Sequence, residues 1–350
     1  MHAPFRLLAA ATLAAALSLP AAAQAPIPLR ITGHFTANAK VVEGIERPFY
    51  GTLPGRVGAP VAITFNPIDQ VGAQPADVLR LLRSGAFDVM TTPIGQVARD
   101  EPFLDGIDLI GVSTTVADLR KATEAMRAAF DARIQERFGV KAVALWPFGP
   151  QFFFCNHPVK SIADFRGLKI RSYTPSMSAL IQHFGGTPVT LNFTETYPAL
   201  QRGVVNCGIT SATSAHQGNW AEVTTHIFPM SLAGGMQGHF MSVAAWRRFS
   251  PAQQQALDAA FKDMENQLWA LADTSNDIAI ACMTNQPACT EGKKFTNVLS
   301  PVPAADEAAL RAAVSTAVLP SFRDSCSRVW NNCVTMWNST VGAARGYSLN

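Results

Sequence analysis

The order of apolar and polar positions between residues 161 and 211 changes repeatedly from a short period to a helical one. Short runs of apolar and β-branched residues predict strands at 168–171, 188–191 and 204–209. The stretches between them have helical spacing and are followed by glycine, which predicts helices at 176–184 and 195–202. Strand and helix therefore alternate with short connections, which favours a parallel sheet covered by helices.

The same alternation runs through the first half of the chain. Strands are expected at 29–33, 61–65, 87–91 and 140–146, and helices at 75–84 and 118–138. In the longer helix, Leu119, Met126, Phe130 and Ile134 fall near one face, as in a helix that packs on a sheet. The chain then passes into a second unit, and this crossing is a candidate hinge.

A long helix is expected after Ser250. Serine suits the N-cap position, Pro251 the first helical position, and Gln253 completes a capping box. Apolar residues then recur at helical spacing to about Ala281. About 30 residues of helix would be about 45 Å long, more than one lobe needs. The alternative is a broken pair of helices.

The N-terminus has the pattern of a secretory signal. Arg6 precedes an apolar run over 7–19, and the small residues that follow offer cleavage after Ala23 or Ala25. The run is shorter than the roughly 20 residues that span a bilayer. We therefore expect a signal peptide at 1–23, export to the periplasm, and removal of the signal; the alternative is an uncleaved anchor.

Composition narrows the function classes. The 350 residues leave room for two lobes after the signal. A formal net charge of +3 gives no electrostatic footprint for nucleic acid. Charged residues make up 15% and hydrophobic residues 48%, which suits a folded globular protein rather than a disordered one.

One residue at a predicted strand end points to a binding chemistry. Arg171 closes the strand 168–171, and sheets of this kind bind ligands beyond the carboxyl ends of their strands. A guanidinium there can hold a carboxylate through two parallel hydrogen bonds. The alternative for Arg171 is an ordinary surface salt bridge.

Three motifs in this order resemble one family. They are L-R-S-G-A-F-D-V-M (82–90), D-F-R-G-L-K-I-R (164–171) and E-T-Y-P-A-L-Q-R-G-V-V-N-C-G (195–208). The chain resembles the periplasmic solute-binding proteins of TRAP transporters, the DctP-like family. The resemblance implies an α/β, two-lobed periplasmic binding protein fold (type II-like) with a hinge and a long helix crossing both lobes. It also implies capture of an organic acid by Arg171, delivery to the membrane subunits of a TRAP permease, and a soluble monomer.

The lobe boundaries follow from the predicted elements and the resemblance. We expect residues 26–147 with about 237–277 in the first lobe. Residues 148–236 with about 278–350 then form the second lobe and the C-terminal helices.

The chain departs from the family at Gln151. Many relatives carry a second ligand-facing arginine there, in a G-x-R pattern that reads Gly149-Pro150-Gln151 in this chain. A neutral amide brings hydrogen bonds but no charge. The departure favours a monocarboxylate, of which an aromatic or 2-oxo acid is one hypothesis, over a dicarboxylate or a sialic acid.

Further ligand-binding candidates lie at strand ends or beside Arg171 and Gln151. In the second lobe and at the crossing they are Trp146, Phe148, Phe193, Thr210, Ser211 and Trp220; in the first lobe they are His34, Asp69, Gln70, Thr91 and Thr92. Aromatic residues in a strand are more often core, and a lone histidine is more often structural. In the family a metal ion can bridge ligand and protein, but no spacing here supports one, so no cofactor is expected.

Six cysteines in an exported chain indicate disulfides. The family resemblance favours Cys155–Cys207. The other four pair locally as Cys282–Cys289 and Cys326–Cys333, or cross-pair between the two segments. Seven residues of continuous helix separate two Cα atoms by about 10 Å, so local pairs require breaks in the helices.

Two other classes remain as alternatives. A secreted hydrolase is disfavoured because the sequence has neither a G-x-S-x-G nor an H-E-x-x-H motif, although catalytic residues can be scattered. An ABC-type receptor or a sensory ligand-binding domain would share the two-lobed fold, so the fold alone does not separate them.

Overall fold

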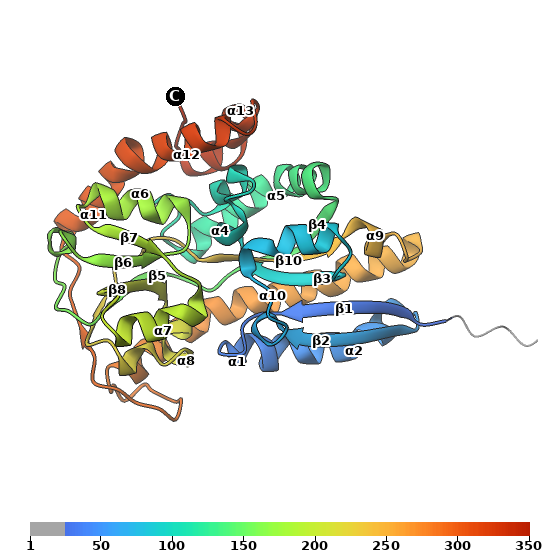
Figure 1. Ribbon diagram of the computed structural model, residues 1–350, viewed down its shortest axis with the longest axis horizontal. Coiled ribbons are helices and arrows are strands. Elements are labelled where there is room, and N and C mark those ends of the chain that lie inside the picture. The colour runs from blue at the N-terminus through green and yellow to red at the C-terminus, as the bar shows by residue number, and fades with distance from the viewer. Residues whose placement is uncertain (1–24) are drawn as a thin grey trace, which may run out of the picture.

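The computed structural model describes residues 25–350, and the predicted signal peptide lies outside them. The chain forms two mixed sheets side by side (Figure 1). The first sheet has the order β2-β1-β3-β10-β4, with β10 antiparallel to both of its neighbours. Its strands are β1 (Ile27–Gly33), β2 (Val61–Pro67), β3 (Val89–Pro93), β4 (Val140–Pro147) and β10 (Met236–Ser242).

The second sheet has the order β11-β9-β5-β8-β6-β7. Its strands are β5 (Gln151–Cys155), β6 (Lys169–Ser172), β7 (Thr187–Thr190), β8 (Cys207–Ser211), β9 (His226–Phe228) and β11 (Val298–Leu299). Strand β6 runs parallel to β7 and β8, and Arg171 is level with Val189 and Gly208. The predicted parallel strand–helix unit is therefore present, and the two-lobed α/β fold class is confirmed.

Helices cover both sheets. They are α1 (Ala39–Val41), α2 (Arg47–Val57), α3 (Val78–Arg83), α4 (Ile94–Val97), α5 (Val116–Phe138), α6 (Pro175–His183), α7 (Phe193–Gln201), α8 (Ala212–Gln217), α9 (Val243–Trp246), α10 (Pro251–Met283), α11 (Ala304–Ala313), α12 (Leu319–Ser327), α13 (Cys333–Trp337) and α14 (Ala343–Arg345). Single 3₁₀ turns occur at Ile68–Gln70, Pro75–Asp77, Pro102–Ile107, Ile162–Phe165 and Trp220–Glu222, and π turns at Val42–Glu46, Val314–Val318 and Asn338–Gly342.

One predicted strand begins later than its sequence pattern suggests. The apolar run 204–209 predicts a strand from Val204, but β8 begins at Cys207. The amides of Val204 and Val205 instead bond to the carbonyl of Ala199 and complete the turn that ends α7. Val204 is 46% exposed, so its apolar side chain is not part of the core.

The helix α10 is continuous and crosses both lobes. Ser250 and Gln253 form the predicted capping box. It packs on α2 and β4 of the first lobe, where the indole of Trp269, near the middle of the helix, donates to the carbonyl of Leu145 at 2.9 Å. Its second half packs on α8 of the second lobe, where Thr213 bonds to Ser275 at 2.8 Å. The alternative of two broken helices is therefore wrong.

All three expected disulfides are present. Cys155 and Cys207 are directly opposite each other in the antiparallel pair β5–β8. Cys282 lies at the end of α10 and Cys289 in the loop that follows, with Cα atoms 4.5 Å apart. Cys326 and Cys333 belong to α12 and α13, with Cα atoms 5.9 Å apart. Helix breaks separate both local pairs, and the cross-paired alternative is wrong.

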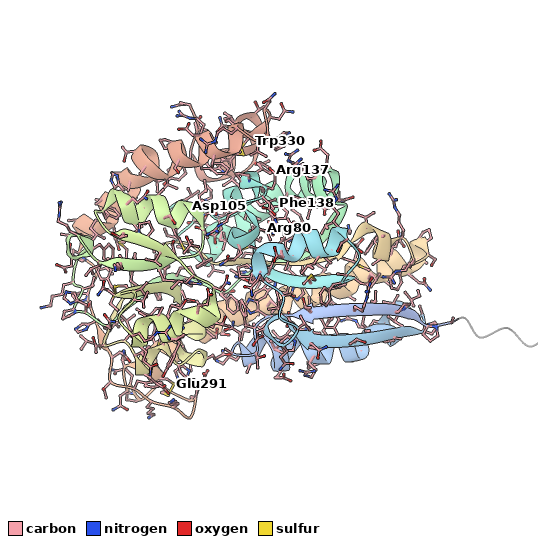
Figure 2. All side chains as sticks on the ribbon, in the orientation of Figure 1. Arg80, Asp105, Arg137, Phe138, Glu291 and Trp330 are labelled. Carbon is pink, nitrogen blue, oxygen red and sulfur yellow. A yellow bond between two sulfur atoms is a disulfide. The ribbon has the colours of Figure 1, made fainter. Side chains whose placement is uncertain are left out.

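The C-terminal helices run from α11 at the left edge of Figure 1 to α12 and α13 at its top. The π turn Val314–Val318 contacts α6, and α12 contacts both α6 and the 3₁₀ segment Pro102–Ile107. Trp330, which is labelled in Figure 2, packs edge-to-face on Phe103, and the ring centroids are 4.8 Å apart. Residues 304–345 thus contact both lobes, so the assignment of this segment to the second lobe stays a proposal.

Candidate functional site

A small cavity lies between the lobes. Residues from both lobes form its wall: His34, Phe35, Asn38, Pro93, Phe148, Gln151, Arg171, Tyr173, Phe193, Thr210, Ser214 and Gln237. The space open to the centre of a water molecule is about 30 Å³, and one water needs roughly 10–15 Å³ by the same measure. Phe35 of the first lobe stacks on Phe193 of the second, with centroids 5.9 Å apart. The lobes are therefore closed over this space.

Arg171 is held rigidly in the wall. The strand β6 places it at the carboxyl end of the second sheet, and its side chain is 3% exposed. Its Nε donates to the carbonyl of Leu191 at 3.1 Å and its Nη1 to the carbonyl of Ile209 at 2.7 Å. The guanidinium carbon also lies 4.7 Å from the ring centroid of Tyr173. These contacts fix the plane of the guanidinium, which matters for two-point recognition of a carboxylate.

No carboxylate among the described residues forms a direct ion pair with Arg171, although the charge of Glu195 is near enough to raise the pKa of Arg171 somewhat. Within residues 25–350, no carboxylate oxygen lies within 4.0 Å of its guanidinium nitrogens. Burial lowers the pKa of Arg171 to about 10, so the group is still charged at neutral pH. A buried, unpaired cation costs free energy, and an anion placed beside it would offset that cost. The cavity is therefore suited to an anion.

Gln151 forms a neutral part of the wall. Its Nε2 donates to the carbonyl of Gly149 at 2.9 Å, and its Oε1 accepts from the hydroxyl of Tyr173 at 2.9 Å. Gly235 packs so close that a Cβ there would collide with the Gln151 amide. Gln151 is thus fixed by packing and hydrogen bonds, and it adds no positive charge beside Arg171.

His34 is neutral in the cavity wall. Its Nδ1 accepts from the backbone amide of Phe35 at 2.8 Å, and its Nε2 lies 3.0 Å from Oε1 of Gln237. Gln237 uses its Nε2 to donate to the carbonyl of Gly235 at 2.8 Å, so its Oε1 accepts from His34. Burial lowers the pKa of His34 to about 4. Arg171 is therefore the cation of this wall at neutral pH.

The chain matches a known family over most of its length. Residues 33–316 match the family described as bacterial extracellular solute-binding protein, family 7 (DctP). The chain belongs to this family. The resemblance found in the three sequence motifs is thereby confirmed.

A curated relative of this family 7 protein is the sialic acid-binding periplasmic protein SiaP of Vibrio cholerae. It is 27% identical over 151 residues, which is 42% of this chain and 46% of the relative. The match thus spans about half the length of SiaP.

Two solved structures share the fold of this family 7 protein. One is DctP6 of Bordetella pertussis, an extracytoplasmic solute receptor binding pyroglutamic acid; the other is a TRAP periplasmic solute binding protein from Desulfovibrio salexigens with bound orotic acid. Each is 16% identical, covers 91% of this chain and 99% of its own, and has a TM-score of 0.78.

Six of the predicted ligand-binding residues of this family 7 protein line the cavity, and the fold brings them together from five separate segments. They are His34, Phe148, Gln151, Arg171, Phe193 and Thr210. Their role in binding stays a prediction, because the cavity shows their placement and not a bound molecule.

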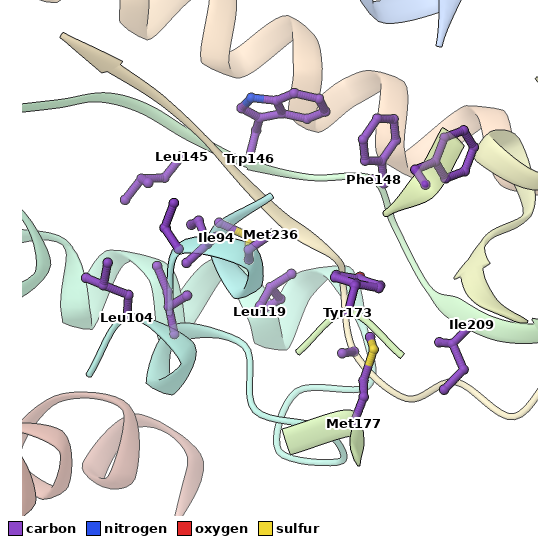
Figure 3. Close-up of a cluster of buried hydrophobic side chains, with 14 of the residues drawn as sticks. Ile94, Leu104, Leu119, Leu145, Trp146, Phe148, Tyr173, Met177, Ile209 and Met236 are labelled. Atoms are coloured by element: carbon purple, nitrogen blue, oxygen red, sulfur yellow. The ribbon is translucent and has the colours of Figure 1, made fainter. Parts of the chain in front are cut away.

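The two predicted tryptophans lie behind the wall. Trp146 is outside the cavity lining and donates its indole N–H to Nδ1 of His239 at 3.0 Å. Its ring supports Phe148, with centroids 5.0 Å apart, as the cluster in Figure 3 shows. Trp220 stacks under Phe193, with centroids 5.4 Å apart. Both rings stabilise the aromatic wall, since their bulk suits core packing.

Five polar candidates also lie outside the cavity lining, and four of them have local structural partners. Ser211 caps α8. Thr91 donates to Glu46, and Thr92 to the carbonyl of Pro75. Asp69 accepts from the backbone amide and hydroxyl of Thr36. Gln70 is exposed.

Sequence reasoning missed half of the cavity wall. The residues missed are Phe35, Asn38, Pro93, Tyr173, Ser214 and Gln237. All but Gln237 lie within five residues after a predicted strand end. The signal that could have found them is the position after the strand, because the chain bends there toward the cleft.

Asp105 connects the lobes beside the cavity. It lies in the first-lobe segment Pro102–Ile107, and its Oδ2 accepts from the amide of Ser176 in the first turn of α6 at 3.1 Å. Burial, and to a lesser extent the nearby charge of Asp108, raises the pKa of Asp105 to about 7. Its contribution to stability is therefore fully present below its ordinary pKa of about 4 and is lost as the pH rises through 7.

We expect Asp105→Asn to stabilise the protein at pH 8 by up to about 4 kcal/mol, because burial raises the pKa of Asp105 by about three units, each worth about 1.4 kcal/mol, and the amide keeps an acceptor for Ser176. The gain should shrink toward pH 5, where Asp105 is already protonated. Urea unfolding of both proteins at the two pH values measures this. An equal difference at pH 5 and pH 8 would show that the carboxyl charge is not the cause.

Between residues 25 and 350, no helix is both long and apolar enough to cross a membrane. The same residues contain no group of three His, Cys, Asp or Glu side chains arranged to hold a metal ion.

Proposed function

We propose that this protein is the extracytoplasmic receptor of a TRAP transporter, and that it captures a small monocarboxylate between its lobes. The observation that carries the proposal is the buried guanidinium of Arg171, which faces an interlobe cavity and has no carboxylate partner within residues 25–350. The ligand's carboxylate would supply the missing negative charge.

The contacts between the lobes support binding by hinge closure. A carboxylate would meet Arg171 in the open cleft, and closure would then exclude water and strengthen the ion pair. On one side the side chain of Lys40, in the first lobe, pairs with Glu291, which is labelled in Figure 2. The backbone amide of Lys40 also donates to Oε1 of Gln217 at 3.1 Å. On another side Asn192 donates to Gln74 at 2.8 Å. These bonds join residues that an open cleft would separate.

The charge count supports a ligand with one carboxylate. The wall offers one guanidinium, and Gln151 and His34 are neutral. A second carboxylate would have to be buried without a cation, which is costly. The pyroglutamic and orotic acids of the two structural relatives each carry one carboxyl group. A dicarboxylate is the ligand that this wall fits worst.

The remaining parts of the proposal concern setting and partners. We place the protein in the periplasm after signal cleavage, as a monomer that presents its closed form to the membrane subunits of a TRAP permease. It leaves its ligand chemically unchanged. The family described as extracellular solute-binding proteins supports this reading over a secreted hydrolase.

A thermal-shift screen against small organic acids tests the proposal. At 100-fold excess over the dissociation constant, a true ligand should stabilise the protein by about 2.7 kcal/mol. Chromatography of the same mixture after incubation should recover the acid unchanged. Product formation would instead support an enzyme, and the absence of stabilisation by any carboxylate would contradict the receptor.

A further inference from the structure

Asn38 lines the cavity and carries a buried polar atom that no other described group satisfies. The residue follows β1 and precedes α1, lines the cavity, and is 1% exposed. Its Oδ1 is buried and has no hydrogen-bond partner within residues 25–350. Although Asn38 occupies the N-cap position of α1, its side chain accepts no bond from the helix. The carbonyl oxygen is therefore available for a ligand.

The orientation of the Asn38 amide is set by its neighbours. Its Nδ2 lies 3.0 Å from Nδ1 of His34, and the same Nδ1 lies 2.8 Å from the backbone amide of Phe35. A backbone N–H only donates, so Nδ1 of His34 carries a lone pair and not a proton. The Asn38 atom facing it must then be the NH₂ group, which leaves Oδ1 as the unpaired atom.

Other polar groups of the wall cannot replace Asn38 as a selector. The ring nitrogens of His34 and the amides of Gln151 and Gln237 are engaged with protein partners. Thr210 and Ser214 carry hydroxyls, which donate or accept and so tolerate either kind of ligand group. A carbonyl oxygen only accepts, and leaving it buried and unpaired costs about 1–3 kcal/mol.

We infer that Asn38 is a specificity residue, and that its Oδ1 accepts a hydrogen bond from an N–H or O–H group of the bound acid. This inference rests on the proposed function, in which Arg171 holds the acid's carboxylate. The ligand class is then a small carboxylic acid with a donor, such as a 2-hydroxy acid or a lactam acid. It is not a 2-oxo acid or an unsubstituted acid, so the 2-oxo hypothesis drawn from Gln151 is set aside.

The two contacts come from different lobes. Asn38 follows β1 of the first sheet, and Arg171 lies on β6 of the second. A ligand with both a carboxylate and a donor links the lobes directly and so favours the closed form. An acid without a donor reaches Arg171 but leaves Oδ1 of Asn38 unpaired on closure. Selection therefore acts when the lobes close.

Calorimetry with matched pairs of acids tests this inference. The pairs are lactate with pyruvate, and pyroglutamate with 3-oxocyclopentanecarboxylate, in which a CH₂ group replaces the lactam N–H, since each pair differs mainly in the hydrogen-bond donor. The wild-type protein should bind the acid that carries the hydrogen-bond donor at least about 10-fold more tightly than the other acid of the pair, which corresponds to about 1.4 kcal/mol. In Asn38→Leu the preference should fall within about 2-fold, mainly through weaker binding of the acid with the donor.

A matched control is Asn297→Leu. Asn297 also has a buried, unpaired Oδ1, but it lies outside the cavity lining and donates to the carbonyl of Thr224 at 2.7 Å. This variant should retain the wild-type preference within each pair, whatever its stability.

The outcomes separate the inference from the proposed function. Equal affinity within both pairs in the wild type, or a preference that persists in Asn38→Leu, would overturn the role of Asn38 while the receptor assignment stands. If Asn38→Leu fails to fold, the affinities of the wild-type protein for the two acids of each pair still test the role of Asn38. Acids that bind equally well to Arg171→Ala and to the wild type would instead overturn the proposed function.

Discussion

Replacing Arg171 with alanine is expected to abolish measurable binding of a small carboxylate, a loss of at least about 100-fold, or about 3 kcal/mol. The side chain supplies the positive charge of the cavity wall and is already oriented by the carbonyls of Leu191 and Ile209. Removing it leaves the ligand carboxylate buried without a cation. Calorimetry with a carboxylate found in the thermal-shift screen measures the loss.

Two further variants test whether the loss of binding is due to the guanidinium group at position 171 and not to the removal of any arginine. Arg171→Lys keeps the charge but cannot reproduce both carbonyl bonds and a two-point contact, so it should also bind weakly. Arg166→Ala removes an exposed arginine from the same segment and should bind like the wild type. Unaltered affinity in a folded Arg171→Ala protein would contradict the site assignment.

The sequence predicts the scaffold around Arg171 because its apolar periodicity matches the observed packing. The face of α5 formed by Leu119, Met126, Phe130 and Ile134 is fully buried, and the Ser250–Gln253 capping box starts α10 as expected. Local propensity and tertiary packing agree in these segments, so pattern alone is sufficient.

The segment 39–57 could not be predicted in the same way. It forms α1, a π turn and α2, yet it contains Pro54 inside a helix and Gly51 near its middle. Both residues disfavour an isolated helix. Burial of Phe49, Tyr50 and Leu53 against the first lobe outweighs that cost, and such tertiary stabilisation does not appear in local spacing.

The sequence predicted only half of the residues that line the cavity, because tertiary packing decides which side chains face it. Strand ends identify which segments reach the cleft, but not which side chain turns into it. Thr91 and Thr92 end a strand as expected, and yet both hydroxyls bond inside the first lobe. The orientation of Asn38 depends on His34 and the amide of Phe35, a three-group arrangement that no single-residue pattern encodes.

A buried carboxylate behind the cavity wall organises this arrangement. Glu46 is fully buried, and its Oε2 accepts from the backbone amide of His34 at 2.8 Å. Its Oε1 accepts from Thr91 at 3.0 Å and from Nε2 of His239 at 2.9 Å. His239 must donate there, because its Nδ1 accepts from the indole of Trp146. Glu46 thus fixes the backbone that carries His34 and, through it, Asn38.

The charge on Glu46 is retained despite its burial. Burial alone would raise the pKa of Glu46, but the hydrogen bond from His239 and the favourable interactions with His239 and His34 lower it below its ordinary value. The stability that the charged group contributes is therefore present above the ordinary pKa of a glutamate and is lost as the pH falls through the lowered value.

Replacing Glu46 with alanine is expected to cost about 3–5 kcal/mol of unfolding free energy at pH 7, because three buried donors lose their acceptor and a void remains. Glu43→Ala is the matched control: Glu43 is exposed and pairs with Arg47 at i,i+4, so its loss should leave the free energy of unfolding nearly unchanged. Urea unfolding of the three proteins compares them, and similar stabilities for the two variants would contradict the role given to Glu46. As the pH falls through the lowered pKa of Glu46, the difference in stability between wild type and Glu46→Ala should narrow, because protonation removes the same acceptor charge that the substitution removes.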